Sequence, residues 1–592
     1  MGCGLILVSN KGIPSHIEYD HDNPVNKGSL CPRGNCMIEM VKNTQRLKNP
    51  AIRIDGSLIE SSWDEAIGVA VQRILDIKKK YGARSIGVVV SPGLTNEEIY
   101  LAGVLAKDTI KTPNFDISLS SDDMNLFMGL EEDPLKKVGI FTVNDIDDSD
   151  CVLIVGDQLS KAPCSSKNVM NAKYKKKGTK IIVIDHKRSH TAWFASTFMQ
   201  ANPGTEWLIL LGMVKAVMDS KKSVSGKERT LKSLLNRITF DGISKLSGVP
   251  SGTIMSSANE FASSKKGTIT ISTGFNRVHP LTAVLSKMLA SVSKGKKGVL
   301  PFYTYINSRG AGYIRNIMFG EKRTMTTPEM VEEAVAGRIK AIISFGVDVV
   351  SLAKWGNIFG KSFQLKMLAA SDIFPSRTTD VADIIFPSAS ILEKNGSMVL
   401  GDDTVLNIEK ALPTIEASRK DLEIMQRLIF GIGKKIIGAD ELNKDLRKAK
   451  GKASRSSSVA LIGRMIMKSL SELKQKKRKP YTLVADEDIA HFMEGSYTKK
   501  FYWPDRVCGD PLLRIGKTTA KELAVNEGDE VIVSSKNGDL LLDVMIDDGI
   551  PPKYAFIPAH FIDVRNLFGR KISDPTGRII LEPVGITIEK VN

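Results

Sequence analysis

The sequence predicts a multidomain α/β protein that combines doubly wound α/β domains with a carboxyl-terminal β-barrel. Its 592 residues exceed what one hydrophobic core organises, because domains of about 100 to 200 residues would number about three to five. Short β-branched runs alternate with helical stretches through most of the chain, which is typical of parallel sheets wound with helices. Near the end of the chain, apolar and polar positions alternate between turns, which indicates a barrel.

The clearest βαβ unit begins with the run VLIVG at residues 152–156 and ends with KIIVID at 180–185. Both runs are apolar and β-branched, and helical-looking residues lie between them. Similar patterns occur at 268–274 (TITISTG), with a helix-like segment from Pro280, and at 341–346 (AIISFG). Each strand ends in Gly or Asp, and doubly wound sheets bind their ligands at the carboxyl edge. These segments therefore predict sheets of the dinucleotide-binding type.

A change in composition separates the predicted barrel from the rest of the chain. Residues 451–480 are rich in Lys, Arg and Ser, which is typical of a basic linker or an exposed helix between domains. From 523 to 544 apolar and polar residues alternate, with turns at 527–529 and 536–538. We therefore expect the final domain to occupy residues 481–592.

Composition excludes several classes of protein. The hydrophobic fraction of 42% and the charged fraction of 25% are close to globular averages, so a disordered or fibrous chain is not expected. No apolar stretch reaches the ~18 residues of a membrane span and no amino-terminal secretion signal is present, so we expect a cytoplasmic protein without a span. Six cysteines in so long a chain do not make a disulfide framework and are expected to be thiols or metal ligands.

The net charge of +17 favours acidic partners through long-range attraction. Much of the excess lies in the lysine-rich runs at 173–177, 294–297 and 474–479. No zinc-finger spacing, helix-turn-helix signal or aromatic-basic ribonucleoprotein motif accompanies these runs. We therefore expect no nucleic-acid partner, and the lysines fit solvated faces or docking to an acidic protein.

The most specific segment is 182–206, which reads IVIDHKRSHTAWFASTFMQANPGTE: a strand ending in Asp, a basic cluster, then Pro-Gly-Thr and an acidic residue. Related segments occur at 152–163 (VLIVGDQLSKAP), 337–350 (GRIKAIISFGVDVV) and 372–397 (DIFPSRTTDVADIIFPSASILEKNGS), and the end of the chain carries GDEVIVSSKNG and IPAHF. Together these segments resemble the molybdopterin oxidoreductase superfamily and, within it, the large subunit of formate dehydrogenases. The resemblance implies a bis(molybdopterin guanine dinucleotide) cofactor with molybdenum or tungsten. It also implies interleaved dinucleotide-binding domains over residues 51–450 and a closing barrel of the double-psi type.

Glycines and carboxylates at strand ends are the candidate dinucleotide-binding residues. A carboxylate such as Asp185 or Glu206 accepts hydrogen bonds from guanine or from ribose hydroxyls, and glycines allow close approach of the backbone to pyrophosphate. Taken singly, each glycine is equally consistent with a simple turn and each Asp with a cap. The resemblance implies that the following residues bind the cofactor: Gly156, Asp185, Gly204, Thr205, Glu206, Gly274, Asn276, Gly346, Asp348 and His560.

The amino terminus resembles the second half of an iron–sulfur motif. Cys3 and Cys31 are separated by 27 residues, as are the last two of the four cysteines that the family uses for a four-iron, four-sulfur cluster. The first two have no counterpart, and Cys36 lies outside the pattern. We interpret residues 1–50 as the remnant of this domain, with an incomplete start favoured over completion by a partner subunit or loss of the cluster. Arg33 stands where the family places a basic residue between cluster and pterin.

The position of the metal ligand departs from the formate dehydrogenases. Alignment on Asn114, Asp116 and Gly129 places Asp122 where relatives have a cysteine or selenocysteine, and Asp123 where they have a histidine. A carboxylate is a hard ligand, and the resemblance implies that Asp122 binds molybdenum or tungsten. The neighbouring residues Ser120, Ser121 and Asp123 are equally consistent with a site that binds no metal. The arginine of the formate site also has no counterpart except Arg309 nearby, and His186, His190 and His279 are expected to be surface or packing residues.

Two functions follow from these features. The first is a molybdenum- or tungsten-pterin oxidoreductase subunit that acts on a small molecule and passes electrons to an iron–sulfur or flavin subunit of a hetero-oligomer. The alternative is a catalytically silent scaffold, similar to the degenerate molybdopterin-type domain in the large iron–sulfur subunit of respiratory complex I. The missing cysteines and the missing His–Arg pair favour the scaffold. The retained dinucleotide-side residues Asp185 and Gly204 to Glu206 favour the enzyme.

Overall fold

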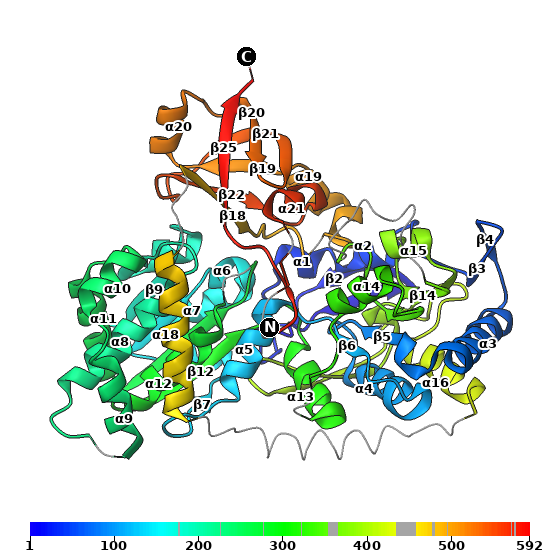
Figure 1. The fold of residues 1–592 in the computed structure, drawn as a ribbon, viewed down its shortest axis with the longest axis horizontal. Helices are drawn as coiled ribbons and strands as arrows, with labels where there is room; N and C mark the ends of the chain where they lie inside the picture. Colours follow the sequence, from blue (N-terminus) through cyan, green and yellow to red (C-terminus); the bar gives the residue numbers. More distant parts are fainter. Residues whose placement is uncertain are drawn as a thin grey trace.

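The computed structural model describes residues 1–175, 178–224, 226–275, 278–320, 323–352, 365–433, 458–475, 480–493, 495–569, 571–572 and 576–591. It has two α/β lobes with a β-barrel above them, and the amino terminus lies between the two lobes (Figure 1). The predicted fold class is confirmed, because two helix-covered sheets and a closed six-stranded barrel make up the molecule.

The first lobe contains a six-stranded sheet of order β10-β9-β8-β11-β12-β7 in which all neighbouring strands are parallel. Both faces are covered, because Leu153 and Ile182 pack into one hydrophobic cluster and Val152 and Ile181 into another. This arrangement explains the continuous apolar runs of the sequence, since a strand buried on both faces has no polar side. The strands are β7 (Gly139–Ile140), β8 (Cys151–Val155), β9 (Lys180–Asp185), β10 (Thr197–Gln200), β11 (Lys266–Ser272) and β12 (Lys296–Phe302).

Helices wind around both faces of this sheet. One of these helices begins at Glu206, where a carboxylate complements the helix dipole. Another begins after His279, whose ring accepts a hydrogen bond from the Leu281 N–H at 3.2 Å and is followed by Pro280. The helices of this lobe include α6 (Gln158–Lys161), α7 (Ser166–Lys175), α8 (Glu206–Ser220), α9 (Gly226–Leu235), α10 (Phe240–Ser247), α11 (Ser251–Ser263) and α12 (Pro280–Val292).

The second lobe contains a seven-stranded sheet of order β4-β3-β15-β14-β13-β5-β6. The five strands from β15 to β6 run parallel to one another. The hairpin β3–β4 adds two strands beyond β15, and β3 pairs with β15 in antiparallel orientation. The chain leaves this sheet after β6, builds the first lobe and returns at β13, so the two lobes are interleaved in sequence. The strands are β3 (Ala51–Ile54), β4 (Ser57–Glu60), β5 (Ile86–Val90), β6 (Phe115–Ile117), β13 (Ala341–Phe345), β14 (Met367–Asp372) and β15 (Ile384–Pro387).

Helices also cover the second sheet on both sides. Val88 and Ile343 belong to a large hydrophobic cluster on one face of the sheet. Val89 and Ile342 pack with Met330 in a smaller cluster on the opposite face. The helices of this lobe are α3 (Trp63–Tyr81), α4 (Asn96–Val104), α13 (Ser308–Phe319), α14 (Thr327–Val335), α15 (Arg377–Val381) and α16 (Asp421–Gly431), and α5 (Ser121–Leu130) follows β6 into the space between the lobes (Figure 1).

The barrel closes in the order β18-β22-β19-β21-β20-β25. Val531 and Val533 point into its core and Ile532 between them is 40% exposed, which is the alternation that predicted it. The predicted alternating run starts too early, because helix α20 (Lys517–Leu523) ends where we placed its first residue. The strands are β18 (Tyr481–Asp486), β19 (Leu512–Ile515), β20 (Glu530–Ser535), β21 (Gly538–Ile546), β22 (Tyr554–Pro558) and β25 (Val584–Lys590).

The segment expected to be a basic linker contains helix α18 (Val459–Gln475) within the residues that the structure describes. Ile462 and Ile466 on this helix are buried in the core of the first lobe, beside α9 and α12. The remainder of 451–480 lies outside the described residues, apart from 458 and 480. None of the helices in the described part of the chain is long and apolar enough to cross a membrane.

The amino-terminal segment forms a hairpin of β1 (Ile6–Asn10) and β2 (Ile13–Glu18), followed by the short helices α1 (Pro32–Asn35) and α2 (Met37–Lys42). It is attached to the barrel domain near α19 (Tyr502–Val507), where the Asn43 side chain donates to the Lys500 carbonyl at 2.7 Å and the Glu39 carboxylate accepts from the Tyr502 N–H. The segment therefore bridges the lobes and the barrel.

Candidate functional site

A cavity of about 720 Å³ lies where the amino-terminal segment, both lobes and the barrel domain meet. The barrel domain contributes Tyr497 and Thr498, and the loop after β12 contributes Tyr303 and Thr304. Seven of the predicted site residues line this central cavity: Cys3, Cys31, Arg33, Asp122, Gly274, Gly346 and Asp348. The structure thus brings together residues that lie up to several hundred positions apart in the chain.

Gly346 is placed directly after β13 and has a φ of +66°, a conformation that residues with a side chain rarely adopt. A Cβ atom at this position would lie 3.2 Å from the Cβ of Ser91. Asp348 holds the same loop in place, because its carboxylate accepts hydrogen bonds from the Thr378 and Ser351 hydroxyls at 2.6 and 2.5 Å. This backbone cradle fits a pterin dinucleotide that must lie close to the strand ends.

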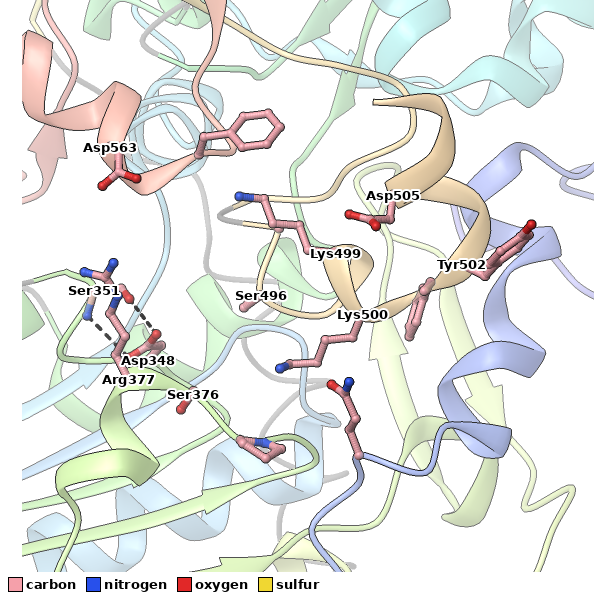
Figure 2. Close-up of a pocket in the computed structure, with 15 residues that line it drawn as sticks. Asp348, Ser351, Ser376, Arg377, Ser496, Lys499, Lys500, Tyr502, Asp505 and Asp563 are labelled. Carbon is pink, nitrogen blue, oxygen red and sulfur yellow. Dashed lines mark hydrogen bonds between the residues drawn. The ribbon is translucent and has the colours of Figure 1, made fainter. Parts of the chain in front are cut away.

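A second cavity of about 740 Å³ adjoins the first, and Asp348, Ser351, Ser496 and Phe501 line both. Figure 2 shows that Lys499 and Lys500 enter it from the segment before α19, opposite Arg377. Ammonium and guanidinium groups bind phosphate oxygens strongly. Three carboxylates, those of Asp348, Asp505 and Asp563, also line this cavity and balance its three cations.

Lys499 has an unusual electrostatic environment. Burial and, to a lesser extent, the positive charge of Arg565 lower the pKa of its ammonium to about 8 against the opposing effect of Asp563. The ammonium lies 3.9 Å from the centroid of the Phe561 ring, a cation–π contact. Sequence reasoning missed this residue, although two lysines between aromatic residues in YTKKFYW were a usable signal.

Asp122 is placed by the first turn of α5. The hydroxyl of Ser120 caps this helix and accepts from the Asp123 N–H at 3.0 Å. The Asp122 side chain is buried, and its Oδ2 accepts from the backbone N–H of Gly274 at 3.0 Å. Because Gly274 follows β11 of the first lobe and α5 follows β6 of the second, this hydrogen bond joins the two lobes at the cavity. A buried carboxylate on the cavity wall is suitable chemistry for a hard metal ion.

Asp123 does not line the central cavity. Its two carboxylate oxygens accept from the Thr304 N–H at 2.9 Å and from the Ser308 hydroxyl at 2.7 Å. Burial raises the pKa of this carboxyl, and the hydrogen bonds oppose the shift. Asp123 therefore anchors the loop after β12 instead of facing the space where a substrate would bind.

Arg309 is also engaged within the protein. Its guanidinium makes ion pairs with Glu131 at 2.9 Å and with Asp403 at 3.0 Å, and it lies over the rings of Phe127 and Tyr313. The side chain is nearly fully buried and does not line either cavity. A cationic group that does line the central cavity is Lys161, which sequence reasoning missed.

Asp185, His186 and Glu206 form a closed cluster between the first lobe and the barrel. Asp185 Oδ1 accepts from the His186 N–H at 2.8 Å, and His186 Nδ1 lies 2.9 Å from Glu206 Oε1. The His186 ring stacks on Phe556 of β22 at 5.2 Å and an interplanar angle of 13°. Its Nε2 is buried and makes no hydrogen bond within the part of the chain that the structure describes. His186 is thus a packing residue whose remaining nitrogen is available to an acceptor or a donor.

The other predicted cofactor residues lie outside the two cavities. Gly156 follows β8 with a φ of +87°, and a Cβ there would lie 3.2 Å from the Ser272 carbonyl oxygen, so the neighbouring strand requires the glycine. Gly204 and Thr205 make the turn before α8. His560 is buried, with Nε2 accepting from the Asp488 N–H at 2.9 Å, and burial lowers its pKa to about 4. Asn276 lies outside the described residues.

Cys3 and Cys31 lie together at the central cavity, with Arg33 beside them. The Arg33 guanidinium donates to the carbonyls of Ser160 and Lys161 at 3.3 and 2.8 Å, which fixes it between the amino-terminal segment and α6. Cys36 is not part of this group, because it is buried in an apolar cluster with Phe374, and burial raises its pKa to about 12.

The thiol donors fit an iron–sulfur cluster in part. Cys164, a residue that the motif did not predict, interacts with both Cys3 and Cys31. Hydrogen bonding from Cys164, followed by the charge of Arg33, lowers the pKa of Cys31 to about 5 against the effect of burial. Thiolates are the form that binds iron. Among the side chains that the structure describes, no three His, Cys, Asp or Glu residues are arranged around a single metal ion.

Comparisons with known proteins agree with this geometry. Residues 46–429 match the molybdopterin oxidoreductase family, 1–43 the molybdopterin oxidoreductase Fe4S4 domain and 483–582 the molybdopterin dinucleotide binding domain. The chain is 25% identical to the alpha subunit of the F420-dependent formate dehydrogenase of Methanocaldococcus jannaschii, over 95% of this chain and 94% of that one. It is 25% identical to the alpha subunit of F420-dependent formate dehydrogenase 1 of Methanococcus maripaludis, over 98% and 96%.

Among solved structures, the acetylene hydratase of Pelobacter acetylenicus has the same fold, with a TM-score of 0.73 over 99% of this chain and 98% of that one at 14% identity. The three domain matches support the predicted cofactors, a bis(molybdopterin guanine dinucleotide) with molybdenum or tungsten and a four-iron, four-sulfur cluster. They cover residues 1–43, 46–429 and 483–582, and the longest unmatched stretch between them is 430–482. The chain therefore belongs to the molybdopterin oxidoreductase family.

Proposed function

We propose that this chain is the metal–pterin subunit of a formate dehydrogenase-like oxidoreductase, which passes electrons to an iron–sulfur or flavin partner subunit. The similarity to formate dehydrogenase alpha subunits extends over almost the whole chain and supports this assignment. The single observation that carries the proposal is the buried Asp122 carboxylate on the wall of the central cavity, at the position of the family's metal ligand.

The bound cofactor would supply two-electron chemistry at its metal. The residues of this chain hold and orient it. Asp122 ligates the metal, and the Gly274 N–H fixes the direction of the carboxylate through its bond to Oδ2. Gly346 would let the backbone approach a bound pterin at the second lobe.

The basic cavity beside Asp348 is suited to the phosphates of one dinucleotide arm. It shares lining residues with the central cavity, and it presents Arg377, Lys499 and Lys500 together with three carboxylates (Figure 2). The second arm would lie over the first lobe, where His186 Nε2, which makes no hydrogen bond within the described part of the chain, would bind a base.

A small substrate in the central cavity would contact side chains different from those that bind formate in the formate dehydrogenases. Arg309 is engaged by Glu131 and Asp403, whereas Lys161 is one of the cations that line the cavity, and its ammonium pairs with Glu487 at 2.9 Å. Lys161 would orient an anionic or strongly polar substrate beside Asp122.

The alternative is a scaffold of the complex I type, and two observations favour it. The residue in the histidine position, Asp123, points into the protein, and Arg309 is neutralised by two carboxylates. Such a scaffold would keep the fold and bind no pterin.

Elemental mass spectrometry and pterin fluorescence of the purified chain, produced in a host that makes the cofactor, test the proposal. Wild type is expected to hold stoichiometric molybdenum or tungsten with bound pterin. Asp122→Ala is expected to lose metal, while a control at the exposed Asp510, Asp510→Ala, keeps it. A folded wild-type protein without pterin would support the scaffold instead.

A further inference from the structure

A segment of the barrel domain forms part of the wall of the central cavity. Between α21 (Ile562–Phe568) and β25 the chain leaves the barrel, and its residues 576–581 reach the second lobe. Four of these residues, Arg578 to Leu581, line the central cavity. In Figure 1 this red segment descends from the barrel into the space between the two lobes. We call residues 576–581 the strap.

A buried ion pair fastens the strap to the second lobe. The Arg578 guanidinium donates to both carboxylate oxygens of Asp116, at 2.6 Å each, and to the Ile117 carbonyl at 3.0 Å. The Arg578 side chain is 5% exposed and that of Asp116 is 2% exposed. Asp116 is held in turn by Thr327, whose N–H and hydroxyl donate to its Oδ2 at 2.7 and 2.6 Å. This two-pronged contact fixes both the position and the direction of the strap.

A second contact holds the strap one residue earlier. The Thr326 hydroxyl donates to the Gly577 carbonyl at 2.7 Å. Gly577 has a φ of +68°, and a Cβ there would lie 2.7 Å from Thr326 Cγ2, so the close approach requires glycine. Pro328, two residues after Thr326, and Ser118, next to Ile117, both line the central cavity. The strap is therefore fastened at the cavity wall.

The strap has little apolar packing of its own. Ile579 and Ile580 are half-buried, and within the described part of the chain they pack into none of the hydrophobic clusters, whereas Leu581 belongs to the barrel core. A segment held mainly by polar contacts opens locally more readily than one held by a core. When the strap opens, Arg578 and Asp116 both return to water, and their hydration offsets much of the lost attraction.

The barrel has other attachments that do not involve the strap. Lys161 of the first lobe pairs with Glu487 of the barrel domain at 2.9 Å. The hydroxyl of Tyr497, also from the barrel domain, donates to Asp372 of the second lobe at 2.9 Å. Opening of the strap therefore leaves the barrel docked on both lobes.

We propose that the strap is a gate of the central cavity. Release of Arg578 from Asp116 opens a route through which a pterin dinucleotide enters, and the restored ion pair retains it. A route that opens is needed because the amino-terminal segment, both lobes and the barrel domain all contribute to the cavity wall. The identity of the ligand rests on the proposed function, whereas the opening of the strap does not.

Hydrogen exchange of the full chain, followed by mass spectrometry, tests the opening. Arg578→Gln is expected to speed exchange at 576–581 at least tenfold and to leave β11 and β12 at the wild-type rate. Arg578→Lys, which keeps the charge but not the two-pronged contact, is expected to lie between the two. The matched control Arg514→Gln breaks an Arg–Asp pair inside the barrel domain, with Asp488 at 3.0 Å, and is expected to leave exchange in the strap unchanged. Wild-type exchange at 576–581 in Arg578→Gln, or equally faster exchange throughout the seven-stranded sheet, would overturn the proposal.

Thr326→Cys combined with Gly577→Cys tests the gate itself. The two γ atoms of Thr326 lie 2.7 and 3.2 Å from the Cβ position at 577, which is close enough for a reversible disulfide. With this disulfide formed, the loaded chain is expected to lose pterin on dialysis several-fold more slowly than after reduction. Wild-type protein taken through the same oxidation and reduction is expected to show no difference. Equal loss from the oxidised and reduced double variant would overturn the gate.

Two outcomes separate the strap from other failures. If Arg578→Gln does not fold, as judged by circular dichroism, exchange at 576–581 in the oxidised and reduced double variant decides whether the strap opens. Wild-type protein without pterin would count against the proposed function, and hydrogen exchange at 576–581 would still support or overturn the strap.

Discussion

The backbone N–H of Gly274 donates a hydrogen bond to Asp122 Oδ2 at 3.0 Å, and this bond connects the two α/β lobes at the wall of the central cavity. Asp122 is on the first turn of α5, after the seven-stranded sheet, whereas Gly274 follows β11 of the six-stranded sheet. A carboxylate held in this way presents a fixed orientation to a metal in the cavity. The same bond means that Asp122 also contributes to the docking of the lobes.

Asp122→Asn separates the two roles of this side chain. The amide oxygen of Asn still accepts from the Gly274 N–H, so the thermal midpoint is expected to stay near the wild-type value. The charge is lost, so bound molybdenum or tungsten is expected to fall at least tenfold, a change of about 1.4 kcal/mol or more. Metal content and calorimetry on the same sample measure both effects. Unchanged metal content would show that Asp122 is only a structural residue.

Gly346→Ala tests the backbone cradle of the second lobe. The φ of +66° alone makes a side chain cost about 1–2 kcal/mol, and the new Cβ would also crowd Ser91 at 3.2 Å. Gly320→Ala is a matched control, since Gly320 has a φ of +62° but open space around its Cβ position. Both variants are expected to lose stability, and only Gly346→Ala is expected to lose bound pterin as well. Equal pterin content in the two variants would contradict a role of the cradle in cofactor binding.

Lys499 is expected to make phosphate binding in the second cavity depend on pH. Its pKa of about 8 means that the ammonium is charged below pH 8 and neutral above it, so its attraction for phosphate is lost as the pH rises through this value. Equilibrium binding of guanosine diphosphate to the cofactor-free chain is expected to weaken several-fold between about pH 7 and pH 9. Lys499→Gln is expected to bind more weakly at pH 7 and to show a flatter profile. The exposed Lys517→Gln serves as the control, and an unchanged profile in Lys499→Gln would exclude Lys499 as the titrating group.

Arg309→Ala distinguishes a structural arginine from a substrate-binding one. Removal of the guanidinium leaves the buried Glu131 and the Asp403 carboxylate without their cation, which costs about 3–5 kcal/mol of stability. A clearly lower thermal midpoint is therefore expected, with metal and pterin content per folded chain unchanged. A stable variant that had lost only its affinity for substrate would show instead that Arg309 acts at the active site.

Much of the fold could be predicted from the sequence, because strands and helices leave local patterns of apolar and polar residues. The runs at 152–156 and 180–185 became β8 and β9 within a residue, since a strand buried on both faces is visible as a continuous apolar stretch. The helix from Pro280 is α12, with Pro in its first turn. The basic composition of 451–480 suggested a linker or an exposed helix and did not reveal that α18 is partly buried, because its buried face needs only a few apolar residues such as Ile462 and Ile466.

The site was less accessible to sequence reasoning, because it depends on contacts between distant residues. Asp122, Gly274 and Gly346 were identified through family resemblance, and the structure places them at one cavity. The partners of Arg309, Glu131 and Asp403, are set by tertiary packing and leave no local pattern. The same holds for Cys164, which lines the central cavity together with Cys3 and Cys31 although these lie in a distant part of the sequence.

The central claim is that Asp122 ligates a pterin-bound metal, and X-ray absorption at the molybdenum or tungsten edge tests it most directly. The spectrum of the wild-type protein is expected to contain an oxygen ligand that is lost in Asp122→Ala but kept in Asp510→Ala. Identical spectra in wild type and Asp122→Ala, or a correctly folded wild-type protein that contains neither metal nor pterin, would contradict the claim.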